Sequence, residues 1–186
     1  MSDPEDDLVI RYKESGLQKD YEALVQRWLP SIQRFLRLQL GSDRDACEEV
    51  QQEVLVALVP NLAGFNGRSQ FSTFLFRLVR NKAIDHQRRQ MRYRKVHQPL
   101  EEEQLVPDRS EDPLDSLVQK ESAERLFALI LQLPLPDREL LYFREIEELG
   151  EKEVSVLTGR PLGTLKSRLH RIKKKLFLQM EEGGSV

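Results

Sequence analysis

The chain has 186 residues, a formal net charge of −2, 39% hydrophobic residues and 32% charged residues. That length predicts one domain or two small ones, and the hydrophobic fraction suits small helical units with a large surface. The single cysteine, Cys47, excludes a disulfide framework and a cysteine-based zinc finger. The sequence has no apolar run long enough to cross a membrane, and its acidic start is unlike a signal peptide. We therefore expect a cytoplasmic protein without membrane insertion.

Charge is strongly segregated along the chain, although the total is near zero. Between Asn66 and Leu100 the only acidic residue is Asp85, among nine arginines and lysines. Residues 101–124 then carry nine acids against two cations, and residues 154–180 carry seven cations and no acid. Two basic blocks separated by an acidic one predict two modules that bind polyanions.

The N-terminal third is predicted to be helical. We expect residues 1–7 to lack fixed structure and residues 8–13 to form a short helix. A stronger helix is predicted over 20–40, broken or kinked near Pro30 and closed by a glycine cap at Gly41.

The next helix is predicted to start near residues 43–45, with Asp45 and Glu48 as a capping box, and to stop at Pro60. Its second face combines apolar residues with Glu48 and Gln52. That face predicts either a protein partner or another helix of the same domain, and the sequence leaves both open. Cys47, on the same helix, is expected to be a small buried or half-buried residue.

A loop over residues 61–70 is predicted to lead into a helix over about 72–91. One face of that helix carries Leu75, Leu78 and Val79, and a second face carries a polar stripe. The stripe consists of Arg77, Asn81, Asp85, Arg88 and Arg92. Cations hold phosphates and asparagine and aspartate read base edges, so with the nearby phenylalanines this stretch indicates a site for unpaired nucleic acid. The alternative is a solvated basic face with Phe71, Phe74 and Phe76 in the core.

Residues 96–116 are predicted to be an extended acidic linker, because Pro99, Pro107 and Pro113 interrupt any helical period. It acts either as a passive tether or as a polyanionic segment that occupies a basic channel in a partner.

The second module contains the most specific pattern in the chain. A helix is predicted over 117–133, and Asp137 is predicted to cap the next one. A short helix over 151–157, a turn over 158–161 and a helix after Pro161 then have the spacing of a helix-turn-helix.

The last of these helices has an apolar stripe formed by Leu165, Leu169, Ile172 and Leu176. The opposite face carries Gly163, Ser167, His170 and Lys174, flanked by Lys166, Arg168 and Arg171. Small residues permit close approach to DNA and cations clamp phosphates. His170 has no neighbouring histidine or cysteine with metal-ligand spacing, so we expect neither a metal nor a cofactor.

These motifs resemble bacterial sigma factors of the sigma-70 family, in the compact extracytoplasmic-function (ECF) group. SQFSTFLFRLVRNKAIDHQRR is similar to sigma region 2, and RPLGTLKSRLHRIKKKL is similar to the recognition helix of region 4. EEVQQEVLVALV is similar to the helix that docks on the RNA polymerase β′ clamp. The resemblance implies an all-α fold with two small helical domains, residues 1–95 and 117–186, joined by the acidic linker. It also implies that regions 1.1 and 3 are absent.

The resemblance further implies a role for individual residues in binding core RNA polymerase and promoter DNA. Contact with the β′ clamp is implied for Glu49, Gln52, Glu53 and Val56, and the second domain is expected on the β flap. Recognition of the −10 element and its non-template strand is implied for Phe65, Asn66, Ser69, Phe71, Phe74, Arg77, Asn81, Asp85, Arg88 and Arg89. Recognition of the −35 element is implied for Arg160, Gly163, Thr164, Lys166, Ser167, Arg168, His170, Arg171 and Lys174. An anti-sigma factor is a further possible partner.

Two other functions remain open from the residues themselves. A stand-alone helix-turn-helix regulator would bind duplex DNA without polymerase, and a partner-switch protein would keep the fold only to bind an anti-sigma factor. An enzyme is not expected, because the sequence has neither a paired acid and base nor a phosphate-cradling glycine loop.

Overall fold

The computed structural model describes residues 4–41, 43–97 and 117–182, and within these ranges it contains α-helices and no strand. The chain divides into two compact units, Met1–Gln104 and Leu105–Val186, which are described separately. This confirms the prediction of an all-α chain built from two helical modules. Most of the predicted linker lies outside the described residues, and its first two residues, 96 and 97, belong to a helix.

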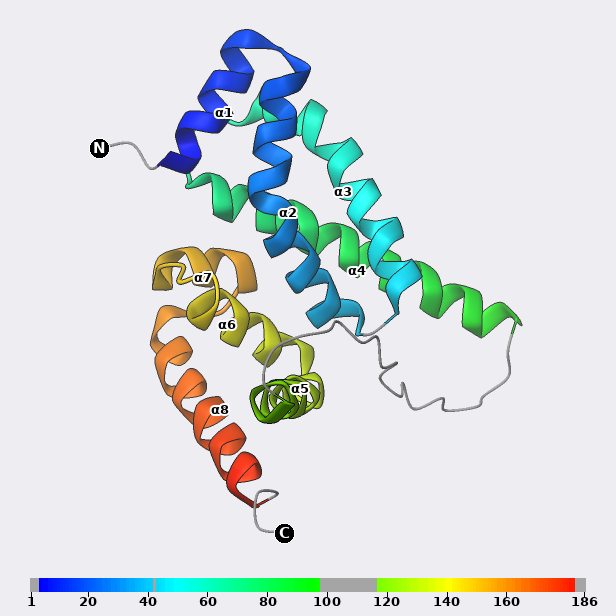
Figure 1. Cartoon of the computed structure of the whole chain (residues 1–186), viewed down its shortest axis with the longest axis vertical. Helices are drawn as coiled ribbons and strands as arrows, with labels where there is room; N and C mark the ends of the chain where they lie inside the picture. Colours follow the sequence, from blue (N-terminus) through cyan, green and yellow to red (C-terminus); the bar gives the residue numbers. More distant parts are fainter. Residues whose placement is uncertain (1–3, 42, 98–116, 183–186) are drawn as a thin grey trace. The chain divides into compact units, whose positions relative to one another are not determined.

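The first unit consists of α1 (Pro4–Ser15), α2 (Gln18–Leu40), α3 (Arg44–Gly64) and α4 (Phe71–His97). The helices α2, α3 and α4 pack against one another, and α1 packs against all three (Figure 1). The expectation that residues 1–7 lack structure was wrong from Pro4 onward, because α1 begins there. Proline at a helix start is favourable, since its fixed φ is helical and its missing N–H has no partner to lose.

Pro30, where a break or a kink was predicted, and Pro60, where a helix was expected to stop, both lie inside helices. The helix α2 runs through Pro30, and α3 runs through Pro60 to Gly64, so the predicted loop begins at Phe65 rather than Asn61. Both prolines are exposed, so water can reach the carbonyl groups that they leave unpaired. Burial of Leu62, which is 1% exposed, holds the last turn of α3 in place.

The caps of these helices agree only in part with the predictions. Gly41 closes α2 with a φ of 78°, as expected. The start of α3 is capped by Asp43, whose carboxylate accepts the backbone N–H of Ala46 at 2.9 Å, rather than by the predicted box at Asp45.

Aromatic rings fill the core of the first unit. Trp28 and Phe35 of α2 contact Phe76 of α4 edge to face, with ring centroids 6.1 and 5.7 Å apart. Phe71 contacts Trp28 in the same way at 5.7 Å. Edge-to-face pairs add to the stabilisation from buried area, so these rings fix α4 against α2.

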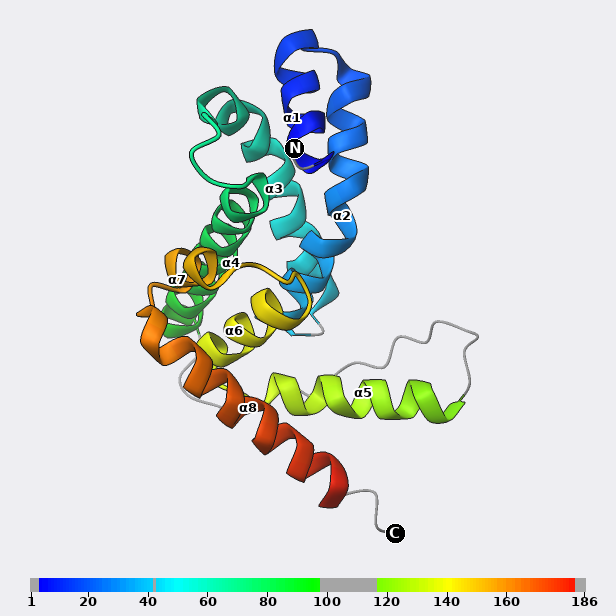
Figure 2. The same ribbon diagram turned by 90° about the vertical axis from the view of Figure 1, so that its left-hand side faces the viewer.

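The second unit consists of α5 (Leu117–Leu131), α6 (Leu135–Glu145), α7 (Glu151–Thr158) and α8 (Leu162–Glu182). The helix α6 packs against α7 and α8, and α5 packs against α8 (Figure 2). Leu140 and Phe143 of α6 are fully buried, together with Val154 of α7. The predicted helix-turn-helix is present at α7 and α8, with Gly159 in the left-handed conformation at φ 69° between them.

Candidate nucleic-acid interface

The polar stripe predicted on the second face of the 72–91 helix lies at the surface of α4. Its members Arg77, Asn81, Asp85, Arg88 and Arg92 are all exposed. On the opposite side Leu75 and Val79 are fully buried. The two faces therefore separate as the sequence predicted, and the stripe is available to a ligand.

The loop before α4 presents Asn66 and Ser69, the two polar residues predicted to capture the non-template strand, at the surface beside a small aromatic cluster. Asn66 folds the loop onto itself, since its Oδ1 accepts the Arg68 backbone N–H at 3.2 Å. Lys13 of α1 donates to the Phe65 carbonyl at 2.5 Å and ties the loop to α1. Both contacts hold the loop in a defined conformation without using the Ser69 side chain.

The three phenylalanines of the predicted capture site differ in accessibility. Phe65 and Phe74 are half-buried, and their ring centroids lie 5.0 Å apart. Phe71 is only 1% exposed, and its ring meets that of Phe65 edge to face with centroids 5.7 Å apart. Phe71 therefore belongs to the core and supports the other two rings, as the alternative interpretation of the sequence had it, whereas Phe74 is only partly buried.

The predicted polymerase-binding residues on α3 fall into two groups. Gln52 is exposed, and Val56 is 76% exposed, which is high for an apolar side chain. Glu53 is engaged within the unit, because its carboxylate accepts from Arg89 of α4 at 2.5 Å and lies 3.8 Å from Lys82. Glu49 lies 3.6 Å from the same Arg89 guanidinium. Arg89 is thus held against α3, away from the exposed stripe of α4.

The helix α8 places most of the predicted −35 residues at the surface. Leu165, Ile172 and Leu176 are buried and Leu169 is half-buried, so the apolar stripe faces the unit as predicted. The exposed residues on the other side are Gly163, Thr164, Lys166, Ser167, His170, Arg171 and Lys174. Among the residues that the structure describes, Lys166, Arg171 and Lys174 have no ion pair with a carboxylate. Their charges are available to a polyanion.

Two predicted −35 residues are instead held by a carboxylate that sequence reasoning had interpreted as a cap. Asp137 does not cap α6, since Pro134 occupies that position without a side-chain bond. The Asp137 carboxylate is buried and accepts from Arg168 at 2.7 and 2.9 Å and from Arg160 at 3.3 Å. The prediction of a cap was wrong because Asp137 lies within the first turn of α6, after Pro134, and its carboxylate binds Arg168 of α8 and Arg160 of the preceding turn.

The charges at this site stabilise one another. Burial by itself raises the pKa of Asp137, but hydrogen bonds and charge from Arg168, and then from Arg160, outweigh it and keep the pKa below its ordinary value. The carboxylate in turn raises the pKa of Arg168. A second pair of the same kind joins Lys173 to Glu145 of α6.

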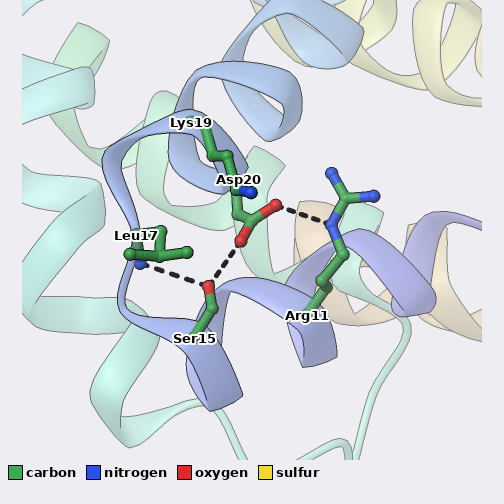
Figure 3. A pocket seen from close by; sticks show the side chains of 5 residues that line it. All are labelled: Arg11, Ser15, Leu17, Lys19 and Asp20. Carbon is green, nitrogen blue, oxygen red and sulfur yellow. Dashed lines mark hydrogen bonds and ion pairs between the residues drawn. The ribbon is translucent and has the colours of Figure 1, made fainter.

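The hollow at the turn between α1 and α2 does not form a reactive site. Figure 3 shows Arg11 and Ser15 of α1 directed at the carboxylate of Asp20, which they bind at 2.7 and 2.5 Å. Both of these contacts therefore hold α1 to α2.

The described residues contain no group of histidines, cysteines and acids that could hold a metal ion. None of the described helices is long and apolar enough to cross a membrane.

Comparison with known proteins places both units in one family. The Sigma-70 region 2 family matches residues 24–93, and the Sigma-70, region 4 family matches residues 123–176. The ECF RNA polymerase sigma factor RpoE of Cereibacter sphaeroides is 32% identical over 86% of this chain and 86% of its own. The ECF RNA polymerase sigma factor SigW of Bacillus subtilis is 27% identical over 93% of this chain and 95% of its own.

Solved structures with a similar fold include two protein complexes. The sigma factor RpoE bound to the anti-sigma factor NepR from Bartonella quintana superposes with a TM-score of 0.70 and 20% identity, covering 88% of this chain and 98% of its own. CnrH bound to the cytosolic domain of CnrY gives 0.68 and 19%, covering 97% and 99%. At these identities the likeness concerns the fold.

Proposed function

The chain belongs to the ECF group of the sigma-70 family, and on that premise we propose that its two units divide the work of promoter recognition. It is an alternative sigma factor that directs promoter-specific transcription. In the proposed division the predicted domain 117–186, within the second unit, anchors duplex DNA at the −35 element, and the predicted domain 1–95, within the first, stabilises melted DNA at −10. The proposed linker is 96–116. Sigma factors are non-catalytic initiation factors, so we propose that RNA polymerase supplies all the chemistry, in the cytoplasm.

The observation that supports this division is the same in both units. One helix buries an apolar stripe and exposes a polar, cationic one on its other side: Leu75 and Val79 against the Asn81 stripe on α4, and Leu165 against Lys166 on α8. Cationic stripes position phosphates, and polar groups among them read bases.

For the −10 element we propose that the loop before α4 holds an extruded base of the non-template strand. Asn66 and Ser69 are exposed for hydrogen bonding, and Phe65 and Phe74 provide partly open rings beside them. Extruding a base costs a few kcal/mol, and each stacking contact recovers about 1–3 kcal/mol. The exposed residues of α4, with Asn81 at their centre, would then bind the adjoining nucleotides.

For polymerase we propose that α3 docks on the β′ clamp through Gln52 and Val56, while the second unit binds the β flap. Val56 and Val59, which are 76% and 44% exposed, lie three residues apart on α3 and form a small apolar patch beside Gln52 for the clamp to cover. Glu49 and Glu53 lie beside this surface but already bind Arg89, so they would contact the clamp only in part. The similar sigma factor RpoE is bound by the anti-sigma factor NepR, and we propose that an anti-sigma factor binds this chain as well.

Run-off transcription tests the proposal directly. The purified chain, added to core polymerase on a genomic library, should give discrete starts that core polymerase alone does not. Val56→Asp should abolish them, whereas Ile10→Asp, which changes a 47% exposed residue on α1, should not. A chain that protects duplex DNA from nuclease equally well without polymerase would indicate a stand-alone regulator. A holoenzyme that starts nowhere would indicate a protein that only binds an anti-sigma factor.

A further inference from the structure

We propose that Asp137 is a positioning residue for −35 recognition, which rests on the function proposed above. In this view Asp137 orients Arg168 on the recognition helix and Arg160 on the preceding turn. Sequence reasoning had treated both arginines as independent DNA contacts. Asp137 itself lies on α6 and touches no DNA.

The geometry of the contact is that of a fork. Arg168 donates through Nε at 2.7 Å and through Nη2 at 2.9 Å to the two oxygens of the carboxylate. Arg160 donates through Nη1 at 3.3 Å to the first of those oxygens. Paired bonds from a planar guanidinium fix its orientation as well as its distance. One carboxylate therefore sets both the recognition helix and the turn that precedes it.

The burial of the carboxylate makes this arrangement specific. The Asp137 side chain is 9% exposed, whereas that of Arg168 is 40% exposed. A buried charge needs its partners, because losing one leaves it without water or a counter-ion. The Nε and Nη2 groups of Arg168 are thus held by a carboxylate inside the unit, and the Nη1 group points away from these two bonds. Ser155 of α7 adds a bond from its hydroxyl to the Arg160 carbonyl at 2.6 Å, which secures the turn.

Other cations of α8 have no such support. Lys166 and Arg171 are exposed and lack an ion pair among the described residues, so they remain adjustable and hold phosphates in any sequence. Lys173 is paired with Glu145, but a lysine is a point charge on a flexible stem and gains no fixed orientation from the pair. The Asp137 contact, by comparison, joins the forked guanidinium of Arg168 on α8 to a buried carboxylate.

Replacing the carboxylate should therefore separate affinity from selectivity. Asp137→Asn keeps the shape but removes the charge and places an amide N–H against guanidinium donors. The two arginines are released, so the unit gains free positive charge and binds any duplex more tightly. It loses discrimination, because Arg168 no longer approaches the groove in one orientation. Loss of folding would lower both the affinity for duplex DNA and the discrimination between sequences. A variant that binds more tightly but discriminates less therefore indicates that Asp137 acts by positioning.

The test compares two variants that each remove one negative charge from α6. Asp137→Asn and Glu145→Gln are assembled with core polymerase, and affinity is measured for the promoter found by run-off transcription and for the same fragment with its −35 element scrambled. We expect Asp137→Asn to lower the ratio of the two affinities at least 10-fold while binding to the scrambled fragment strengthens. Glu145→Gln should change the ratio by less than 2-fold.

A third variant protects the test against misfolding. Arg168→Lys keeps the charge and removes the fork, and should also lower the ratio while circular dichroism shows unchanged helix content. The proposal is overturned if Asp137→Asn keeps the ratio, or if it unfolds and Arg168→Lys keeps it. A wild-type holoenzyme with no −35 preference would overturn the proposed function, and this inference with it. A preference that survives both substitutions overturns the inference alone.

Discussion

The pairing of cations on α8 predicts which of them contribute to DNA binding. Lys166→Ala removes an exposed charge that has no carboxylate partner among the described residues, whereas Lys173→Ala removes one that is paired with Glu145. Each phosphate contact contributes about 0.9 to the slope of log affinity against log salt concentration. We expect Lys166→Ala to reduce that slope by about 0.9 and Lys173→Ala to leave it nearly unchanged.

The predicted change in salt slope corresponds to a measurable change in affinity. Between 50 and 200 mM salt, a difference of about 0.9 in slope changes the affinity ratio of wild type to variant by about 3.5-fold, or about 0.7 kcal/mol. The assay is fluorescence anisotropy of a labelled promoter fragment with the reconstituted holoenzyme at several salt concentrations. Because polymerase contributes equally to every curve, the difference between variants isolates α8. Equal losses of slope for the two lysines would refute the reasoning, since ion pairing would then not decide which cation reaches DNA.

Asn81→Ala should impair strand opening while leaving upstream binding nearly intact, so permanganate reactivity at −10 should fall and the −35 footprint should persist. Phe76→Ala should lower the free energy of unfolding by about 3–5 kcal/mol, because the ring is fully buried between Trp28 and Phe35, and urea titration with far-UV circular dichroism measures this. Burial raises the pKa of the Cys47 thiol to about 11, so at pH 8 it should react with iodoacetamide far more slowly than in the urea-unfolded chain. The folded-state pKa of Asp137 lies below its ordinary value of 3.8, so the ionised carboxylate stabilises the fold at any pH above 3.8, and this stabilisation is lost as the pH falls through the folded-state pKa. Acid titration should therefore reduce the unfolding free energy of wild type more than that of Asp137→Asn.

Placement of the candidate sites could be predicted where a single helix decides it. The spacing of Leu75 and Val79 placed Asn81 on the opposite, exposed face of α4, and the spacing around Leu165 did the same for Lys166 on α8. A helix of known period determines which side chains share a face, and burial of the apolar face then orients it.

Availability of the charged residues could not be predicted in this way. Arg89 and Arg168 fall in the basic stretches that indicated nucleic-acid binding, yet Glu53 and Asp137 pair with them within their own units. The partners lie 36 and 31 residues apart in the chain. Residues so distant in the chain come into contact only when two helices pack, and the sequence around either residue does not predict that contact.

The sequence by itself thus determined the helical class, the two basic modules, the helix-turn-helix and the exposed faces of α4 and α8. Tertiary structure alone decided that α2 and α3 continue through Pro30 and Pro60, that Phe71 lies beneath the surface, and which cations remain unpaired. The physical reason is the distance along the chain over which each effect acts. Helical periodicity acts over a few residues, whereas burial and charge pairing depend on neighbours that only the packed chain brings together.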